Sequence, residues 1–240
     1  MQVTERLIRK LQLRTALDAA DIAAIERLPM TIRELPAQTA VAREGERSSH
    51  CCMLIDGYAC RSKTTDAGKR QILSIHIAGD IPDLQSLHLQ LMDHDLSTLS
   101  RCKVAFISHE SLRGLTRERP QVADALWRET LVDAAVFREW IVNVGRRSAA
   151  SRMAHLLAEI GQRLEAIGLA HGGRYELPMT QLDFADALGL SSVHVNRVIQ
   201  ELRHDGLIEM RKRTVALLDP QRLATLADFD ALYLHQSQNV

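Results

Sequence analysis

The spacing of hydrophobic residues divides the chain into three regions. Residues 3–28 carry leucine and isoleucine at helical spacing, with an interruption near the segment LDAAD. Residues 31–108 contain short segments in which alternate residues point to opposite faces, as in QILSIHI and RCKVAFIS. From Pro120 onward the helical spacing returns. The pattern therefore predicts helices on both sides of a region of short β-strands.

The central region has the turn spacing of a small antiparallel barrel. Glycine interrupts it every 11 or 12 residues, at Gly45, Gly57, Gly68 and Gly79. The segment TTDAG reads as a hairpin turn. Short strands at this spacing are typical of a β-barrel or jelly roll. We assign residues 1–118 to a β-barrel domain with N-terminal helices, which makes the fold class α+β.

A near-heptad hydrophobic stripe follows Pro120, extending over about 25 residues, or roughly 37 Å of helix at 1.5 Å per residue. Such a stripe is typical of a dimer seam, although a helix of this length can also cross its own domain as a core element. We assign residues 119–147 to a dimerisation helix and a hinge near Gly145. The expected interface residues are Leu126, Thr130, Ala134, Phe137, Ile141 and Val144.

The segment TQLDFADALGLSSVHVNRVIQELRHDGL has the residue types of a helix-turn-helix. Ala185 is small enough for two helices to cross closely, and Gly189 accepts a left-handed turn conformation. Val195 and Val198 are placed to anchor the second helix against the first. The alternative is a helical hairpin that serves protein contact.

Flanking residues extend this pattern into a winged domain over residues 148–240, which includes an amphipathic helix at 149–167. Thr180, with Asp183 three residues later, can cap the first helix, and Ser191 can cap the second. Gly206 is placed to end the second helix. The segments LIEM and TVALL then read as two strands on either side of a basic turn, which is the form of a wing.

The outer face of the second helix carries side chains that suit double-stranded DNA. Arg197 can present two donors to a guanine, a contact typically worth ~1–3 kcal/mol of discrimination. Val193 can touch a thymine methyl group, and the wing cations can contact phosphate. The predicted DNA-contacting residues are Thr180, Gln181, Ser191, Ser192, Val193, His194, Asn196, Arg197, Arg211, Lys212 and Arg213.

Composition limits the functions that fit the chain. Its 240 residues include 30 Lys and Arg and 30 Asp and Glu, which excludes a uniformly basic protein that coats nucleic acid. No apolar run approaches the ~20 residues that span a bilayer, and the start lacks the apolar core of a signal peptide. No nucleophile–base pair or glycine-rich phosphate loop is apparent. We therefore expect a cytoplasmic protein that is not an enzyme and needs no cofactor.

The cysteines raise the question of a metal or haem site. Cys51, Cys52, Cys60 and Cys102 form no CxxC pair, and buried free thiols are their ordinary role. His50 and His76 make a haem or metal site conceivable. Adjacent cysteines on a strand point to opposite faces, however, so the first two cannot serve one site. We predict no metal site.

The barrel, the long helix and the winged helix-turn-helix together resemble the Crp/Fnr family of bacterial transcription regulators. The resemblance is carried by REGERSSHCCMLIDGYACRSK, GKRQILSIHIAGDIPDL and MTQLDFADALGLSSVHVNRVIQELRHDGLI. It implies a homodimer that binds a two-fold symmetric DNA operator and contacts RNA polymerase. It also implies a cyclic-nucleotide-binding-like barrel that senses a signal, such as a small-molecule effector, and biases the dimer between two arrangements.

Departures from the family pattern point to a subgroup that uses neither cyclic AMP nor an iron–sulfur cluster. Pro82 and Asp83 stand where cyclic-AMP binders have glycine and glutamate, and Asp95 stands near their phosphate-binding arginine. The chain has no cysteine before Cys51, where the oxygen sensors of the family carry a cluster. The alternative to a DNA-binding regulator is a haem- or metabolite-sensing protein that acts mainly through protein partners.

Overall fold

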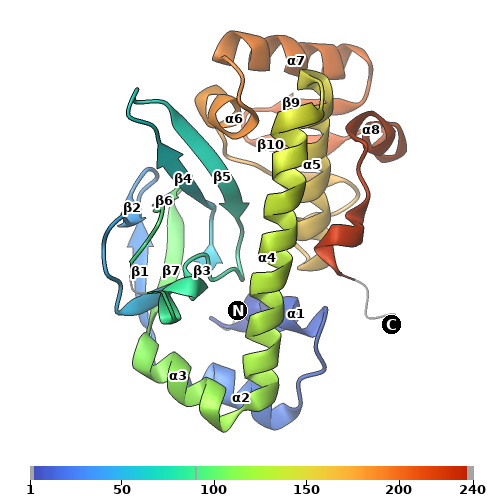
Figure 1. The fold of residues 1–240 in the computed structure, drawn as a ribbon. Coiled ribbons are helices and arrows are strands. Elements are labelled where there is room, and N and C mark those ends of the chain that lie inside the picture. Colours follow the sequence, from blue (N-terminus) through green and yellow to red (C-terminus); the bar gives the residue numbers. More distant parts are fainter. Residues whose placement is uncertain (1–2, 90, 237–240) are drawn as a thin grey trace. The chain divides into compact units, whose positions relative to one another are not determined.

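The computed structural model describes residues 3–89 and 91–236, which form two compact units. Unit 1 extends to Asp133, and unit 2 runs from Ala134 to Gln236. Their boundary lies within one helix, α4 (Pro120–Arg146), drawn in yellow-green in Figure 1. The segment that the sequence set apart as a dimerisation helix and hinge is therefore divided between the units. In the described part of the chain, no helix combines the length and hydrophobicity that crossing a membrane requires.

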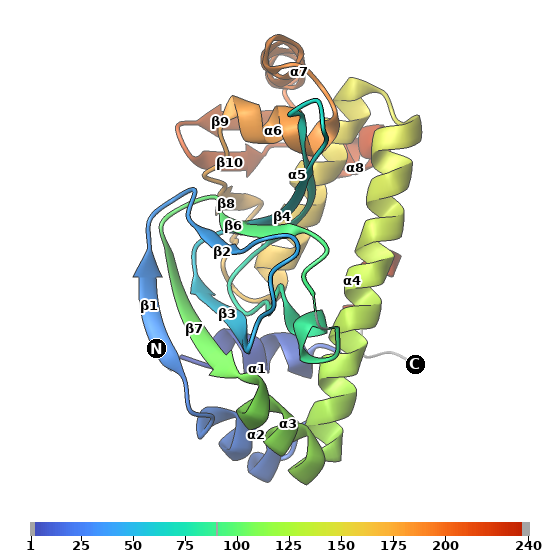
Figure 2. The ribbon, with the colours of Figure 1, turned by 60° about the vertical axis from the view of Figure 1, so that its left-hand side comes forward.

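Unit 1 contains two antiparallel sheets, which Figure 2 shows with their covering helices. One sheet has the strand order β1-β7-β3 and the other has the order β2-β6-β4-β5. Its elements are α1 (Glu5–Gln12), α2 (Ala19–Glu26), β1 (Thr31–Leu35), β2 (Ala40–Ala42), β3 (His50–Asp56), β4 (Ala59–Thr64), β5 (Arg70–His76), the 3-10 helix η1 (Leu84–Leu87), β6 (Asp95–Thr98), β7 (Cys102–Ser108), α3 (His109–Glu118) and the first half of α4. The predicted region of short strands and its barrel architecture are confirmed.

Local sequence explains where these elements begin and turn. Asp18 caps α2 and exchanges hydrogen bonds with Asp21, so the interruption at LDAAD is the start of a new helix. The predicted hairpin between β4 and β5 is confirmed, with Gly68 N–H donating to Thr65 O at 2.8 Å. Gly57 has a φ of +91°, and a Cβ atom there would lie 2.5 Å from Arg101 O, so this tight turn requires glycine.

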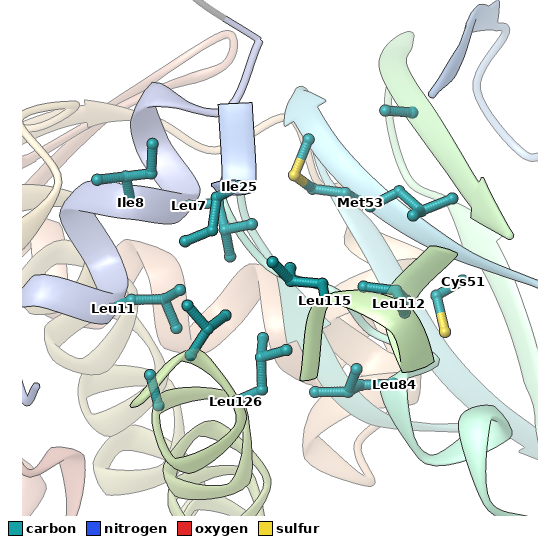
Figure 3. Close-up of a cluster of buried hydrophobic side chains, with 14 of the residues drawn as sticks. Leu7, Ile8, Leu11, Ile25, Cys51, Met53, Leu84, Leu112, Leu115 and Leu126 are labelled. Atoms are coloured by element: carbon teal, nitrogen blue, oxygen red, sulfur yellow. The ribbon is translucent and has the colours of Figure 1, made fainter. Parts of the chain in front are cut away.

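The main core of unit 1 lies between its helices and the β3 side of the first sheet. Figure 3 shows Leu7, Ile25, Leu112 and Leu126 converging from α1, α2, α3 and α4. Leu126, one of the predicted interface residues, is only 6% exposed and belongs to this core. The next residue, Trp127, is 62% exposed, so the exposed stripe of α4 begins one residue later than the predicted one.

A buried polar network also holds unit 1 together. Lys10 on α1 lies 2.6 Å from Asp80 and 2.7 Å from Glu129 of α4, and Arg14 also pairs with Glu129. Arg61 of β4 donates to Pro82 O at 2.7 Å and pairs with Asp133 of α4. Because buried charges are costly unless they are paired, these contacts fix α4 against the barrel.

The face of β5 that carries the polar side chains of Ser74 and His76 is buried. Ser74 and His76 lie side by side, with 2.8 Å between Oγ and Nε2. The Nδ1 atom of His76 lies 3.2 Å from Asp80 Oδ2. Burial lowers the pKa of His76 to about 4, so this imidazole is neutral at physiological pH. The polar residues of the alternation are therefore satisfied within the barrel and do not face water.

Unit 2 contains the second half of α4 and a small sheet with the strand order β8-β10-β9. Its further elements are α5 (Ala149–Ala166), β8 (Arg174–Glu176), α6 (Gln181–Leu188), α7 (Ser192–His204), β9 (Ile208–Arg211), β10 (Thr214–Leu217), α8 (Pro220–Ala227) and the 3-10 helix η2 (Ala231–Leu234). The predicted helix at 149–167, the winged domain and a short helix in the tail are confirmed. The last residues of that tail, 237–240, lie outside the described residues.

The break between α4 and α5 lies slightly beyond the expected hinge. Gly145 is inside α4, and a Cβ atom at this position would meet nothing within 4 Å. The chain leaves the helix at Arg147, and Ser148 caps α5 by accepting a hydrogen bond from Ser151 N–H at 3.2 Å. A serine cap, rather than the glycine, therefore marks the change of direction.

Candidate nucleic-acid interface

Caps and a left-handed glycine set the geometry of α6 and α7. Thr180 accepts a hydrogen bond from Asp183 N–H at 3.1 Å, and the Asp183 carboxylate accepts one from Thr180 N–H at 2.9 Å. Gly189 ends α6 with φ +64° and ψ +39°. Ser191 caps α7 by accepting a hydrogen bond from His194 N–H at 3.2 Å. The predicted capping box, glycine turn and second cap are confirmed.

The two faces of α7 differ sharply. Val195, Val198 and Leu202 are buried in unit 2, which confirms the predicted anchoring role of the two valines. The opposite face is open, and Val193 is 83% exposed. This exposure leaves the Val193 side chain free to make apolar contact with another molecule.

The predicted DNA contacts of the two helices lie at or near the surface. Arg197 is exposed, and its guanidinium makes no hydrogen bond or ion pair with any residue that the structure describes. All five of its donors are thus available to a partner. The exposed residues also include Thr180, Gln181, Ser191 and Asn196, while Ser192 and His194 are half-buried.

The wing is formed by β9 and β10, which meet at a two-residue turn. Arg211 pairs with Thr214 across the ladder, leaving Lys212 and Arg213 at the tip. Lys212 adopts φ +55°, which a side chain other than glycine seldom does. Both tip cations are exposed, and neither side chain bonds another described residue. They are therefore free to contact phosphate.

Arg211 differs from the other wing cations. Its Nε lies 2.7 Å from Glu209 Oε1, so part of its charge is already compensated within the protein. Arg174 on β8, which sequence reasoning did not select, lies in the same sheet and reaches Glu209 at 3.9 Å. The alternation of charge along the strand could have signalled the first pair, whereas the second depends on sheet order.

Arg152 on α5 is a further residue that sequence reasoning missed. Its Nε donates to Arg147 O at 3.0 Å, and its Nη1 donates to Leu188 O at 2.9 Å. The side chain thus joins the break after α4 to the end of α6, next to the turn at Gly189. Both acceptors are backbone carbonyls at helix ends, which otherwise lack partners.

The exposed face of α4 carries large apolar side chains. Trp127 is 62% exposed and Ile141 is 69% exposed, and Leu131 is also open to solvent. Trp127, Ala134 and Ile141 are separated by seven residues, and so are Thr130, Phe137 and Val144. The other four of these six residues are half-buried. Five of the predicted interface residues therefore lie on one heptad stripe, with Trp127 in place of Leu126.

The cysteines of the barrel are all buried free thiols. Cys51 and Cys52 pack in clusters on opposite faces of β3, as the alternation predicted. Burial raises the pKa of Cys51 to about 12, and burial raises that of Cys52 as well. The described residues include no group of three or more His, Cys, Asp or Glu side chains that could hold a metal ion.

Two domain families match this chain. The cyclic nucleotide-binding domain matches residues 32–119, and the Crp-like helix-turn-helix domain matches residues 151–226. Together these ranges cover more than half of the chain. The chain belongs to the Crp/Fnr family of bacterial transcription regulators. As a Crp/Fnr regulator it is a DNA-binding protein, and its α6–α7 pair is the helix-turn-helix.

Relatives within the Crp/Fnr family match most of the chain. The transcriptional activator protein FnrL of Cereibacter sphaeroides is 26% identical, over 89% of this chain and 87% of its own. The transcriptional activatory protein AadR of Rhodopseudomonas palustris is 29% identical, over 93% and 92%. The solved structure of FixK2 from Bradyrhizobium japonicum is 26% identical and covers 83% of this chain and 98% of its own, with a TM-score of 0.75.

The segment GDIPDL of this Crp/Fnr chain places an acidic side chain in the interior of the barrel. Asp83 is buried, and its Oδ1 accepts a hydrogen bond from Cys52 N–H at 2.7 Å. Burial raises the pKa of Asp83 to about 7. The nearby Arg61 is already engaged by Pro82 O and by Asp133. The acidic group at this position is therefore part of the interior structure.

Proposed function

We propose that this Crp/Fnr protein is a homodimer that reads a two-fold symmetric DNA operator with the exposed face of α7. The single observation that carries the proposal is the position of Arg197, exposed on α7 with no partner among the described residues. In each subunit Arg197 would contact a guanine in the major groove, and Val193 would touch a thymine methyl group. Lys212 and Arg213 would contact phosphate and hold the reading helix in register.

The exposed heptad stripe of α4 supports the dimer. Trp127, Ala134 and Ile141 would form one row of the seam, and Thr130, Phe137 and Val144 the other. Burying large apolar side chains between two copies of a helix is the geometry of a two-stranded coiled coil. A two-fold dimer would present two α7 helices to half-sites about one helical turn apart, or roughly 34–36 Å.

The barrel would supply regulation. The buried pair of Arg61 and Asp133 joins β4 to α4, so a signal that alters the barrel would also alter the helix that carries the seam. The relatives that are named transcriptional activators favour contact with RNA polymerase, in the cytoplasm where DNA lies. An effector would act by binding one arrangement of the dimer better than the other.

Selection of bound sequences from random duplex DNA tests this proposal. We expect the wild-type protein to enrich a two-fold symmetric site with half-sites about 10–10.5 base pairs apart. Ile141→Asp places a charge on the seam, so it should sediment as a monomer and enrich no symmetric site. Val142→Asp, one residue off the stripe, is the matched control and should behave as wild type. An Ile141→Asp protein that still sediments as a dimer would overturn the seam, and a monomer that still enriches the symmetric site would overturn its reading by a dimer.

A further inference from the structure

Glu159 on α5 is a buried carboxylate shared by three parts of unit 2. Its residue exposure is 0%. Its Oε2 accepts hydrogen bonds from Trp140 Nε1–H of α4 at 3.0 Å and from the Tyr233 hydroxyl at 2.9 Å. Its Oε1 lies 3.2 Å from Nη1 of Arg163 on its own helix. Because a buried carboxyl group is costly unless its oxygens are hydrogen-bonded, these donors hold α4, α5 and η2 together.

Tyr233 belongs to a segment, residues 228–236, that lies beyond the match to the Crp-like helix-turn-helix domain. Its hydroxyl also lies 3.1 Å from His155 Nε2, and the two rings stack at 5.9 Å between centroids. Phe229 meets the edge of the same imidazole at 5.2 Å. The segment is thus fastened to α5 by aromatic contacts as well as by the carboxylate.

The segment is fastened at its two ends too. Arg147, in the break after α4, donates from Nη2 to Asp228 O at 3.0 Å and pairs with Glu139 of α4 at 2.6 Å. Gln162 of α5 donates to Gln236 at 3.2 Å. Segment 228–236 therefore bonds α5 directly, and it is linked to α4 through Arg147 and Glu159.

We propose that segment 228–236 fixes the angle between α4 and the DNA-reading helices, with Tyr233 as the positioning residue that acts through Glu159. The inference rests on the proposed function, since it assumes that α4 forms the dimer axis. Recognition helix α7 packs on α5, so the α4–α5 angle decides where each α7 lies relative to that axis. A dimer whose two reading helices match the two half-sites binds the second half-site at a high effective concentration.

Loss of the Tyr233 hydroxyl should therefore weaken binding to the complete operator more than binding to a single half-site. Tyr233→Phe keeps the ring but removes one of the two donors to Glu159 Oε2. We expect affinity for the operator selected by the wild type to fall about tenfold, which corresponds to ~1.4 kcal/mol and is comparable to the loss of one buried hydrogen bond. Affinity for a duplex that carries one half-site should change less than about twofold, because the face of α7 is untouched.

The experiment measures both affinities by fluorescence anisotropy, together with affinity for operators whose half-sites are moved by one or two base pairs. Trp140→Phe removes the other donor to Glu159 Oε2, from the α4 side. Both donor variants should discriminate less than the wild type between operators that differ in half-site spacing. Leu232→Ala, an exposed residue of the same 3-10 helix, is the matched control and should retain the wild-type profile.

The outcomes separate the two proposals. If the wild-type protein binds no sequence selectively, the proposed function fails. If the wild type binds its operator but both donor variants keep its affinity and spacing preference, the role of segment 228–236 is refuted alone. An equal loss on the operator and on the half-site, with the spacing profile unchanged, also refutes it, because that is the effect of a general loss of folded protein.

Discussion

The interior of unit 1 and the reading surface of unit 2 use their cations in opposite ways. In unit 1, Arg61, Arg14 and Lys10 are largely withdrawn from water, and each lies against a carboxylate. On the reading side of unit 2, Arg197 and Lys212 are exposed, and neither side chain bonds another described residue. The first set holds a structure together, and the second is free to bind an anion.

This difference explains how a chain with a formal net charge of zero can bind DNA. Paired interior cations add to the total of Lys and Arg but contribute little to the field outside the protein. Exposed unpaired cations act at short range, where phosphate lies within the screening length of about 8–10 Å. The position of each charge, rather than the total, therefore decides which surface recognises DNA.

The largest effect should follow removal of a buried cation. Arg61→Met leaves Asp133 without its partner, so we expect unfolding of unit 1 to become easier by about 3 kcal/mol. This is the low end for a broken buried pair, because Asp133 keeps some contact with water. The matched control is Arg101→Met, since Arg101 and Glu34 form an exposed pair and its loss should leave the unfolding midpoint unchanged. Equal unfolding midpoints for the two variants would contradict the claim that the buried pair stabilises unit 1 more than the exposed pair does.

A second effect should appear in the pH dependence of unit 1. Asp83 has a pKa of about 7 when folded and about 4 when unfolded, so the folded state binds the proton more tightly. The contribution of this proton to the free energy of unfolding is complete below pH 4 and is lost as the pH rises to 7. The loss is at most about 1.4 kcal/mol per pH unit. Asp83→Asn keeps an acceptor for Cys52 N–H, so this variant should gain stability over the wild type across that window. Parallel curves of unfolding midpoint against pH would contradict the assignment.

The smallest effect should come from the tip of the wing. Lys212→Ala would remove one proposed phosphate contact, so it should weaken binding to every sequence alike and lower the slope of log affinity against log salt by about one. Glu209→Gln serves as the converse test because it frees Arg211 and should raise the same slope. Binding titrations between about 50 and 200 mM salt measure both, and an unchanged slope in Lys212→Ala would exclude it from the interface.

The sequence predicted the helix-turn-helix more completely than the packing contacts between distant elements. Thr180, Gly189 and Ser191 act on neighbours a few residues away, so their types and spacing determine the caps and the turn. Leu126 is buried and Trp127 is exposed, because a shift of one residue on a helix changes the face by about 100°. Whether that face meets the barrel depends on packing between distant elements.

Contacts between distant residues could not be predicted. Glu159 reads as an ordinary surface residue of an amphipathic helix, and its burial becomes evident only when α4 and segment 228–236 pack against α5. Arg152 likewise gains its role from the place where α6 happens to end. Hydrogen bonds between side chains separated by many residues depend on the final fold, which a periodic pattern in one sequence does not specify.

The most direct test of the central claim is the sequence preference of Arg197→Ala. Selection from random DNA with this variant should lose the preference for a guanine at one symmetric position in each half-site, at a cost of ~1–3 kcal/mol, and keep the remaining preferences and the spacing. Arg203→Ala, in the last turn of the same helix, should recover the wild-type site. If Arg197→Ala recovers the wild-type site at every position, α7 does not read DNA through this residue and the account is wrong.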